Sequence, residues 1–118
     1  MKHTWVIDID GAITSNTFVF SWLTYYLNKA DQQVVILTGR NPSRKAATES
    51  YLSDHNIYYN AIIFMDEAEP RGFANIGEWK LHQIIELKPL IWFDNNIKDY
   101  KEFHPELAKQ VDCIQVSL

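Results

Sequence analysis

Acidic and small polar residues follow three apolar segments of this sequence. Asp8-Ile9-Asp10-Gly11 ends the first, Thr38-Gly39-Arg40 ends the second, and Asp94 follows "LIWF", with Asp99 a turn later. Carboxylates that share a small volume repel one another unless a cation lies between them. Mg²⁺ prefers carboxylate oxygens together with water and phosphate oxygens. If the fold brings these segments together, they predict a magnesium site.

The elements that must position these residues alternate between strand-like and helix-like patterns. We expect strands over 3–9, 33–38, 61–65, 90–93 and 113–116, and helices over 17–29, 43–56 and 76–87, with short helical turns over 96–103 and 105–109. This alternation predicts an α/β fold: one Rossmann-like, doubly wound sheet of about five mainly parallel strands, with helices on both faces. The carboxyl ends of such strands share one edge, where ligands bind.

Length and composition limit the classes of protein that this chain can belong to. With 118 residues, 47% of them hydrophobic, we expect residues 1–118 to form a single domain. The net charge of −4 argues against a broadly basic nucleic-acid surface, although a local basic patch can exist. Cys113 is the only cysteine, so a cysteine-rich zinc site is excluded. Without an apolar leader or membrane-length segment, we expect a cytoplasmic protein with no membrane partner.

Four motifs in order resemble the haloacid dehalogenase (HAD) superfamily of Mg²⁺-dependent phosphohydrolases. The strand ending in Asp8-Ile9-Asp10-Gly11 is similar to the first motif, and Thr38 in "LTGR" is similar to the second. Lys80 in "EWKLHQ" is similar to the third, and "LIWFDNNIKD" to the fourth. Each motif alone is common by chance, but their order and their places at the ends of elements indicate an HAD-type catalytic domain.

The resemblance implies a phosphomonoester hydrolase that forms an aspartyl-phosphate. It implies that Asp8 attacks phosphorus, while Asp10 acts first as general acid and then as general base. It further implies that Thr38 donates a hydrogen bond to a phosphoryl oxygen and that Lys80 holds the nucleophile and the phosphate. Both aspartates would also bind Mg²⁺, Asp10 through its main-chain carbonyl.

The fourth motif supplies the remaining metal ligands. The resemblance implies that Asp94 binds Mg²⁺. The spacing of "DNNIKD" is at the long end of the family pattern, so Asp99 and the alternatives Asn95 and Asn96 all remain candidates for the second position.

The chain resembles a capless member of the superfamily. Residues 12–16 and 66–75 are too few for the cap domains that many members insert. A site without a cap is open, so we expect it to be closed by a large phosphorylated substrate or by an oligomer partner. Small sugar phosphates also remain candidate substrates.

A narrower resemblance links "VVILTGRNPSRKAATESYL" to the phosphatase half of polynucleotide kinase/3′-phosphatases. Gly39 and Arg40 are the expected substrate-binding residues, although Arg40 could equally form a surface salt bridge. Arg44 and Lys45 could add a local patch for an anionic substrate. A nucleic acid is therefore expected only as a substrate, through its phosphorylated end. The other alternative is a non-catalytic module, regulatory or interacting, that binds phosphate or Mg²⁺ on the same scaffold.

Overall fold

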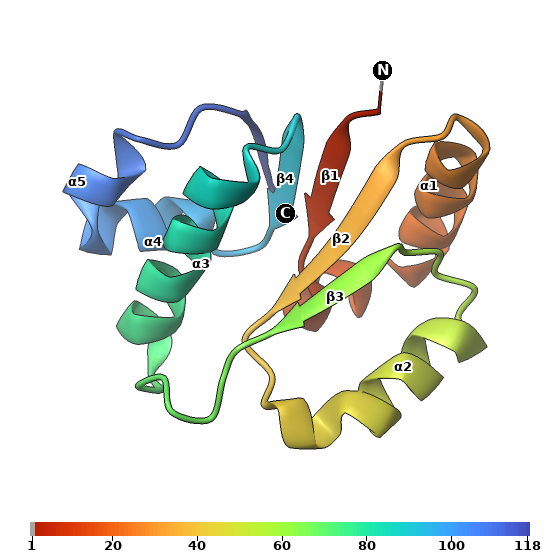
Figure 1. Cartoon of the computed structure of the whole chain (residues 1–118), viewed down its shortest axis with the longest axis horizontal. Coiled ribbons are helices and arrows are strands. Elements are labelled where there is room, and N and C mark those ends of the chain that lie inside the picture. Colours follow the sequence, from red (N-terminus) through yellow and green to blue (C-terminus); the bar gives the residue numbers. More distant parts are fainter. Residues whose placement is uncertain (1) are drawn as a thin grey trace.

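A five-stranded parallel sheet forms the centre of the computed structural model, which describes residues 2–118 (Figure 1). Its strands are β1 (Thr4–Ile7), β2 (Gln33–Thr38), β3 (Ala61–Phe64), β4 (Ile91–Asp94) and β5 (Ile114–Ser117), in the order β3-β2-β1-β4-β5. Every neighbouring pair is parallel, which confirms the predicted fold class. The chain runs outwards from β1 through β2 to β3, and then crosses back through residues 73–87 to place β4 and β5 on the other side of β1. The crevice beside the carboxyl end of β1 is therefore the expected ligand position.

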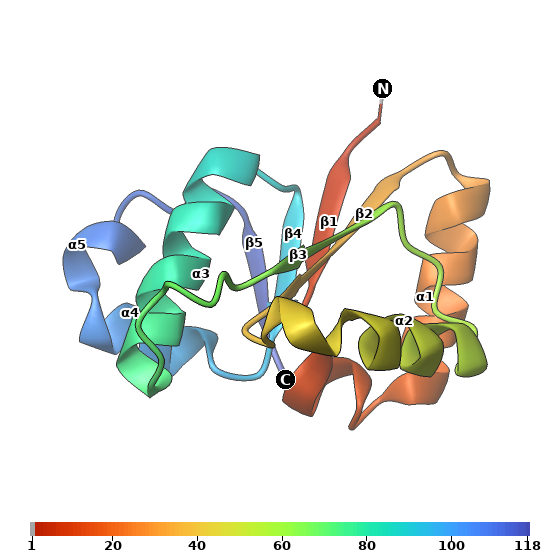
Figure 2. The same cartoon turned by 60° about the horizontal axis from the view of Figure 1, so that its bottom comes forward.

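Helices cover both faces of this sheet (Figure 2). One face packs against α1 (Thr17–Lys29) and α2 (Lys45–Asp54), and the other against α3 (Phe73–Leu87), α4 (Ile97–Phe103) and α5 (Pro105–Ala108). Within residues 2–118, only short connections follow β1 and β3, so no cap domain is inserted there. No helix described for these residues is long and apolar enough to cross a bilayer.

The inner strands β1 and β2 are mainly apolar because their side chains are buried on both faces of the sheet. Ile7 and Ile36 contact the core under α1 and α2. Val6 and Val35, their neighbours along the strands, contact the core under α3 and α4. Successive strand residues point to opposite faces, so continuous apolar runs are what a sheet covered on both sides requires.

Two helices begin differently from the sequence prediction. The segment expected as one helix over 43–56 is a 3₁₀ turn over Pro42–Arg44 followed by α2. The side chain of Asn41 caps this turn, because it accepts a hydrogen bond of 2.8 Å from the Ser43 amide. Helix α3 begins at Phe73, three residues before the predicted start, directly after Gly72 with its φ of 108°.

Candidate active site

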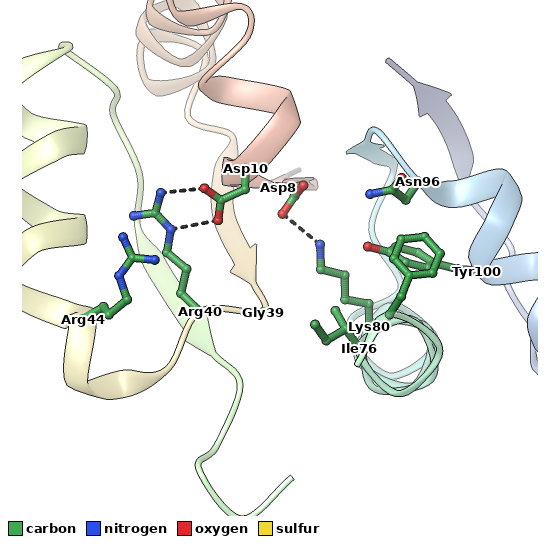
Figure 3. A pocket seen from close by; sticks show the side chains of 10 residues that line it. Asp8, Asp10, Gly39, Arg40, Arg44, Ile76, Lys80, Asn96 and Tyr100 are labelled. Carbon is green, nitrogen blue, oxygen red and sulfur yellow. Dashed lines mark hydrogen bonds and ion pairs between the residues drawn. The ribbon is translucent and has the colours of Figure 1, made fainter. Parts of the chain in front are cut away.

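A pocket of about 330 Å³ opens beside the carboxyl ends of β1 and β2 and against α3 (Figure 3). Residues from five parts of the chain line it: Asp8, Asp10, Gly39, Arg40, Arg44, Phe73, Ile76, Lys80, Asn96 and Tyr100. The pocket lies at the edge of the sheet where the strand order predicts a ligand site. Five of the predicted site residues, namely Asp8, Asp10, Gly39, Arg40 and Lys80, are therefore brought to one cavity.

A buried ionic triad forms the floor of this pocket. Nζ of Lys80 donates to Oδ1 of Asp8 and to Oδ2 of Asp94, both at 2.8 Å. These three side chains are at most 5% exposed. Asp8 is held in place because its amide donates to the Phe93 carbonyl at 3.0 Å, which extends the pairing of β1 with β4 beyond the strand end. The first and fourth motifs thus meet at the same lysine.

The electrostatics of the triad follow from two carboxylates sharing one ammonium in a water-poor site. Burial raises the pKa of Asp8 to about 7, with Lys80 opposing the shift and Asp94 adding to it. Burial disfavours the ammonium of Lys80, but the negative charges of Asp8 and Asp94 outweigh this effect and raise its pKa. When both carboxyls are ionised, the triad carries excess negative charge that a further cation would balance.

Two oxygen atoms beside Asp8 are of the kind that Mg²⁺ binds in proteins. When the Asn95 amide is oriented to donate, its nitrogen lies 3.3 Å from Oδ2 of Asp8 and 3.2 Å from the Asp10 main-chain carbonyl. A carboxylate oxygen and a carbonyl oxygen therefore both face the Asn95 amide nitrogen, which lies between them. Within residues 2–118, no three His, Cys, Asp or Glu residues form a metal-binding group. Mg²⁺ commonly uses only one or two protein carboxylates and completes its shell with water and phosphate oxygens.

Asp10 points away from Asp8 and pairs with Arg40 (Figure 3). Nη2 and Nε of Arg40 donate to the two carboxylate oxygens at 2.7 and 2.9 Å. The chain turns at Gly11, whose φ is 83°, and a Cβ there would overlap the Asn95 side chain. The hydrogen bonds from Arg40 hold the pKa of Asp10 below its ordinary value of 3.8, against a smaller opposing effect of burial. In this conformation Asp10 is ionised at neutral pH, so it accepts protons more readily than it donates them.

Replacing Arg40 by Gln is expected to raise the pKa of Asp10 towards 3.8, because the charged hydrogen bonds that lower it are lost. The pairing stabilises the fold above pH 3.8, and this contribution disappears as the pH falls through the lowered pKa. Titration of the Asp10 carboxyl carbon by NMR measures the shift directly. Lys98→Gln is the control, since it removes an exposed cation from α4 that does not line the pocket. An unchanged pKa of Asp10 in the Arg40 variant would contradict this account.

Thr38 and Asp99 lie outside the pocket surface. Thr38 is fully buried at the end of β2, and its hydroxyl oxygen accepts a bond of 3.1 Å from the Arg40 amide. The Thr38 side chain therefore orients the segment that carries Gly39 and Arg40. Asp99 is exposed on α4 and does not line the pocket, whereas Asn96, at the beginning of that helix, does.

Sequence reasoning missed the aromatic side of the pocket. The Tyr100 ring centroid lies 5.5 Å from Nζ of Lys80, and Phe73 packs against Tyr100 with centroids 5.4 Å apart. Gly77 makes this packing possible, because a Cβ there would lie 2.5 Å from the Tyr100 ring. A glycine inside an amphipathic helical pattern is the sequence signal that could have indicated such a close approach. Phe73 gave no such signal, since it stands in a segment that reads as loop.

Comparison with solved structures finds chains of similar fold. A chain from a structure of the Pnkp1/Rnl/Hen1 RNA repair complex is 19% identical with a TM-score of 0.67, over 98% of this chain and 43% of that one. A chain from a second structure of the Pnkp1/Rnl/Hen1 complex is 18% identical with a TM-score of 0.71, over 99% and 46%. A universal stress protein in complex with cAMP is 13% identical with a TM-score of 0.54, over 99% and 96%.

These similarities establish the fold. No protein-family model and no curated protein matches the sequence. The chain spans less than half the length of the two chains from the repair complex.

Proposed function

We propose that this protein hydrolyses phosphate monoesters at the ends of polynucleotides, with Asp8 as the nucleophile. The observation that carries the proposal is the buried Asp8 carboxylate, which lies at the floor of an open pocket 2.8 Å from a buried lysine ammonium. The lysine orients the carboxylate, and its positive charge favours an incoming phosphate. This arrangement suits an HAD-type nucleophile.

Two steps complete the proposed reaction. An oxygen of Asp8 bonds to phosphorus while the bond from phosphorus to the ester oxygen breaks, and Asp10 gives that oxygen a proton. Water then attacks phosphorus, the bond to Asp8 breaks, and Asp10 takes the proton from water. Because Arg40 holds Asp10 ionised in the free protein, the substrate phosphate must compete for Arg40 before Asp10 can carry a proton.

Asp8, Asp94 and the Asp10 carbonyl are the groups that would hold Mg²⁺. When bound, Mg²⁺ would offset the negative charge of the phosphate and of the two carboxylates. The side chains of this protein would supply the rest: Lys80 orients Asp8, and the Arg40 guanidinium lies at the pocket rim.

The two sides of the pocket favour a polynucleotide over a small ester. Arg40 and Arg44 lie on one side of the pocket and Tyr100 on the other (Figure 3). Phe73, which is 45% exposed, also lines the pocket and packs against Tyr100. Backbone phosphates bind to cations, and bases stack on exposed aromatic rings. Similarity in fold to chains of an RNA repair complex supports the same substrate class.

The proposal is tested by measuring phosphate release in Mg²⁺ from 3′-phosphorylated RNA and DNA oligonucleotides, a 5′-phosphorylated oligonucleotide and glycerol phosphate. We expect kcat/KM to be highest for a 3′-phosphorylated oligonucleotide. Release from glycerol phosphate alone would contradict the polynucleotide part of the proposal. No release from any ester would contradict hydrolysis itself.

Replacing Arg44 by Ala is expected to lower kcat/KM for the 3′-phosphorylated oligonucleotide by about tenfold, the size of one lost charge-assisted phosphate contact. Hydrolysis of glycerol phosphate should stay unchanged, since that ester has no second phosphate. The slope of the logarithm of the binding constant against the logarithm of the salt concentration should become shallower in the variant, by the amount that corresponds to about one phosphate contact. Lys98→Ala, which removes an exposed cation from α4, is the control. Equal losses on both substrates would count against a role for Arg44 in binding the polynucleotide.

A further inference from the structure

Helix α1 presents a row of large apolar side chains to solvent. Phe18 is 77% exposed, Val19 58%, Trp22 60%, Tyr25 41% and Tyr26 54%. Their spacing places them on one side of the helix, while Phe20, Thr24 and Leu27 on the other side are buried against the sheet. We call these five exposed residues the α1 face. None of them lines the candidate active site.

The aromatic rings of the α1 face are packed against one another. Trp22 and Tyr25 each contact Tyr26 edge-on at 5.5 Å between ring centroids, and Tyr25 contacts Tyr58 at 5.8 Å. A groove of about 230 Å³ lies among these rings, with Ser21 and Asn56 as its polar members. The surface therefore has a defined groove. Because its rings already pack against one another, they lose little conformational freedom when another surface covers them.

The exposed area is large enough for an interface. The four aromatic rings of the α1 face, together with Tyr58, expose roughly 400–700 Å², given the area of an aromatic side chain. The largest apolar patch on a typical monomer is about 300–600 Å². A standard interface buries about 800 Å² on each partner, so this face supplies most of what one partner must contribute.

The α1 face is uncharged, as contact between two copies of this chain requires. Between Thr17 and Asn28, α1 has no charged residue, and Lys29 at its end lies over the Tyr25 ring at 5.3 Å. A face with one peripheral cation does not suit the phosphates of a nucleic acid. Two copies that each carry a net charge of −4 repel one another, so contact between them requires an uncharged surface.

We propose that two copies associate through their α1 faces as an antiparallel helix pair, with a twofold axis at Trp22. In a twofold interface, if residue i of one copy contacts residue j of the other, then residue j of the first copy also contacts residue i of the other. The α1 face meets this condition: exposed residues lie three and four positions before Trp22, as Val19 and Phe18, and three and four positions after it, as Tyr25 and Tyr26. Antiparallel pairing therefore places Phe18 against Tyr26 of the second copy.

Sedimentation equilibrium of the whole chain tests this association, with far-UV circular dichroism to verify folding. The wild-type protein should be a dimer. Trp22→Lys should raise the dimer dissociation constant by at least about 30-fold, because a central aromatic anchor is lost and two like charges meet on the axis. Phe103→Lys is the matched control, since Phe103 is 58% exposed on α4, away from this face, and should leave the dimer intact. A wild-type chain that stays monomeric at millimolar concentration overturns the proposal, as does a folded Trp22→Lys dimer of unchanged affinity.

Disulfide trapping tests the antiparallel geometry in a Cys113→Ser background. Trp22→Cys should form a symmetric disulfide between two copies. Phe18→Cys and Tyr26→Cys should cross-link efficiently when mixed and poorly when each is oxidised alone. Efficient self-linking of Phe18→Cys, without linking to Tyr26→Cys, would show a parallel pair and overturn the proposed geometry. These measurements need no substrate, so their result is independent of the proposed hydrolysis.

Discussion

Replacing Asp8 by Asn is expected to lower the rate of phosphate release by at least about 10³-fold, because an amide cannot replace the carboxylate as the nucleophile. The protein should remain folded. The substitution removes one of two buried carboxylates, and Lys80 keeps its bond of 2.8 Å to Asp94. Steady-state phosphate release in Mg²⁺, from an oligonucleotide and from glycerol phosphate, measures the effect.

The control for this variant is Asp54→Asn, which makes the same chemical change at an exposed position at the end of α2. It should release phosphate at the wild-type rate. Near-wild-type turnover in a folded Asp8→Asn protein would remove Asp8 from the role of nucleophile. Because the variant is expected to stay folded, a loss of activity can be assigned to chemistry once circular dichroism shows native secondary structure.

Replacing Lys80 by Met is expected to lower the free energy of unfolding by about 3–5 kcal/mol at pH 8, because two buried carboxylates lose their shared counter-ion. Urea denaturation followed by circular dichroism measures the change. Lys98→Met removes a lysine from an exposed position on α4 and should change the stability little. A loss in Lys80→Met no larger than that of the control would show that the triad does not depend on the lysine charge.

The loss of stability in Lys80→Met should shrink as the pH falls from 8 towards 4. Without the lysine, burial and the nearby negative charge of Asp94 raise the pKa of Asp8 in the folded state further above its unfolded value. A carboxyl whose pKa is raised by folding destabilises the fold above its unfolded pKa. This cost decreases as the pH falls below the folded pKa and is gone below the unfolded pKa. Adding Asp94→Asn to Lys80→Met should recover part of the stability at pH 8, since one buried charge is then removed.

The order of elements and the sheet could be predicted from local patterns. The expected bounds of the helix over 17–29 and the strand over 33–38 agree with α1 and β2, because apolar periodicity and length are properties of a short segment. The meeting of Asp8 and Asp94 also followed from sequence, because both end strands that the parallel topology aligns. Lys80 lies between these two carboxylates because α3 passes the same edge of the sheet.

The direction of individual side chains could not be predicted in this way. Asp10 lines the pocket, but the distances and orientation of its pair with Arg40, 30 positions away in the chain, follow only from the structure. Asp99 follows the acidic pattern of the fourth motif, but it lies on the exposed side of α4. The rotation of that helix directs Tyr100 into the pocket. These outcomes depend on packing between elements that no short segment specifies.

Helix α1 shows the same difference between what local sequence predicts and what tertiary packing decides. Its sequence is apolar nearly all round, and aromatic residues in such a segment usually lie in a core or an interface. The sequence by itself determined that a helix forms here, and it determined the strands and the polar residues at their ends, since these depend on near neighbours in the chain. Only the tertiary structure decided that Phe20 is buried, that Trp22 is exposed and that Arg40 holds Asp10, because burial and ion pairing arise from contacts between distant segments.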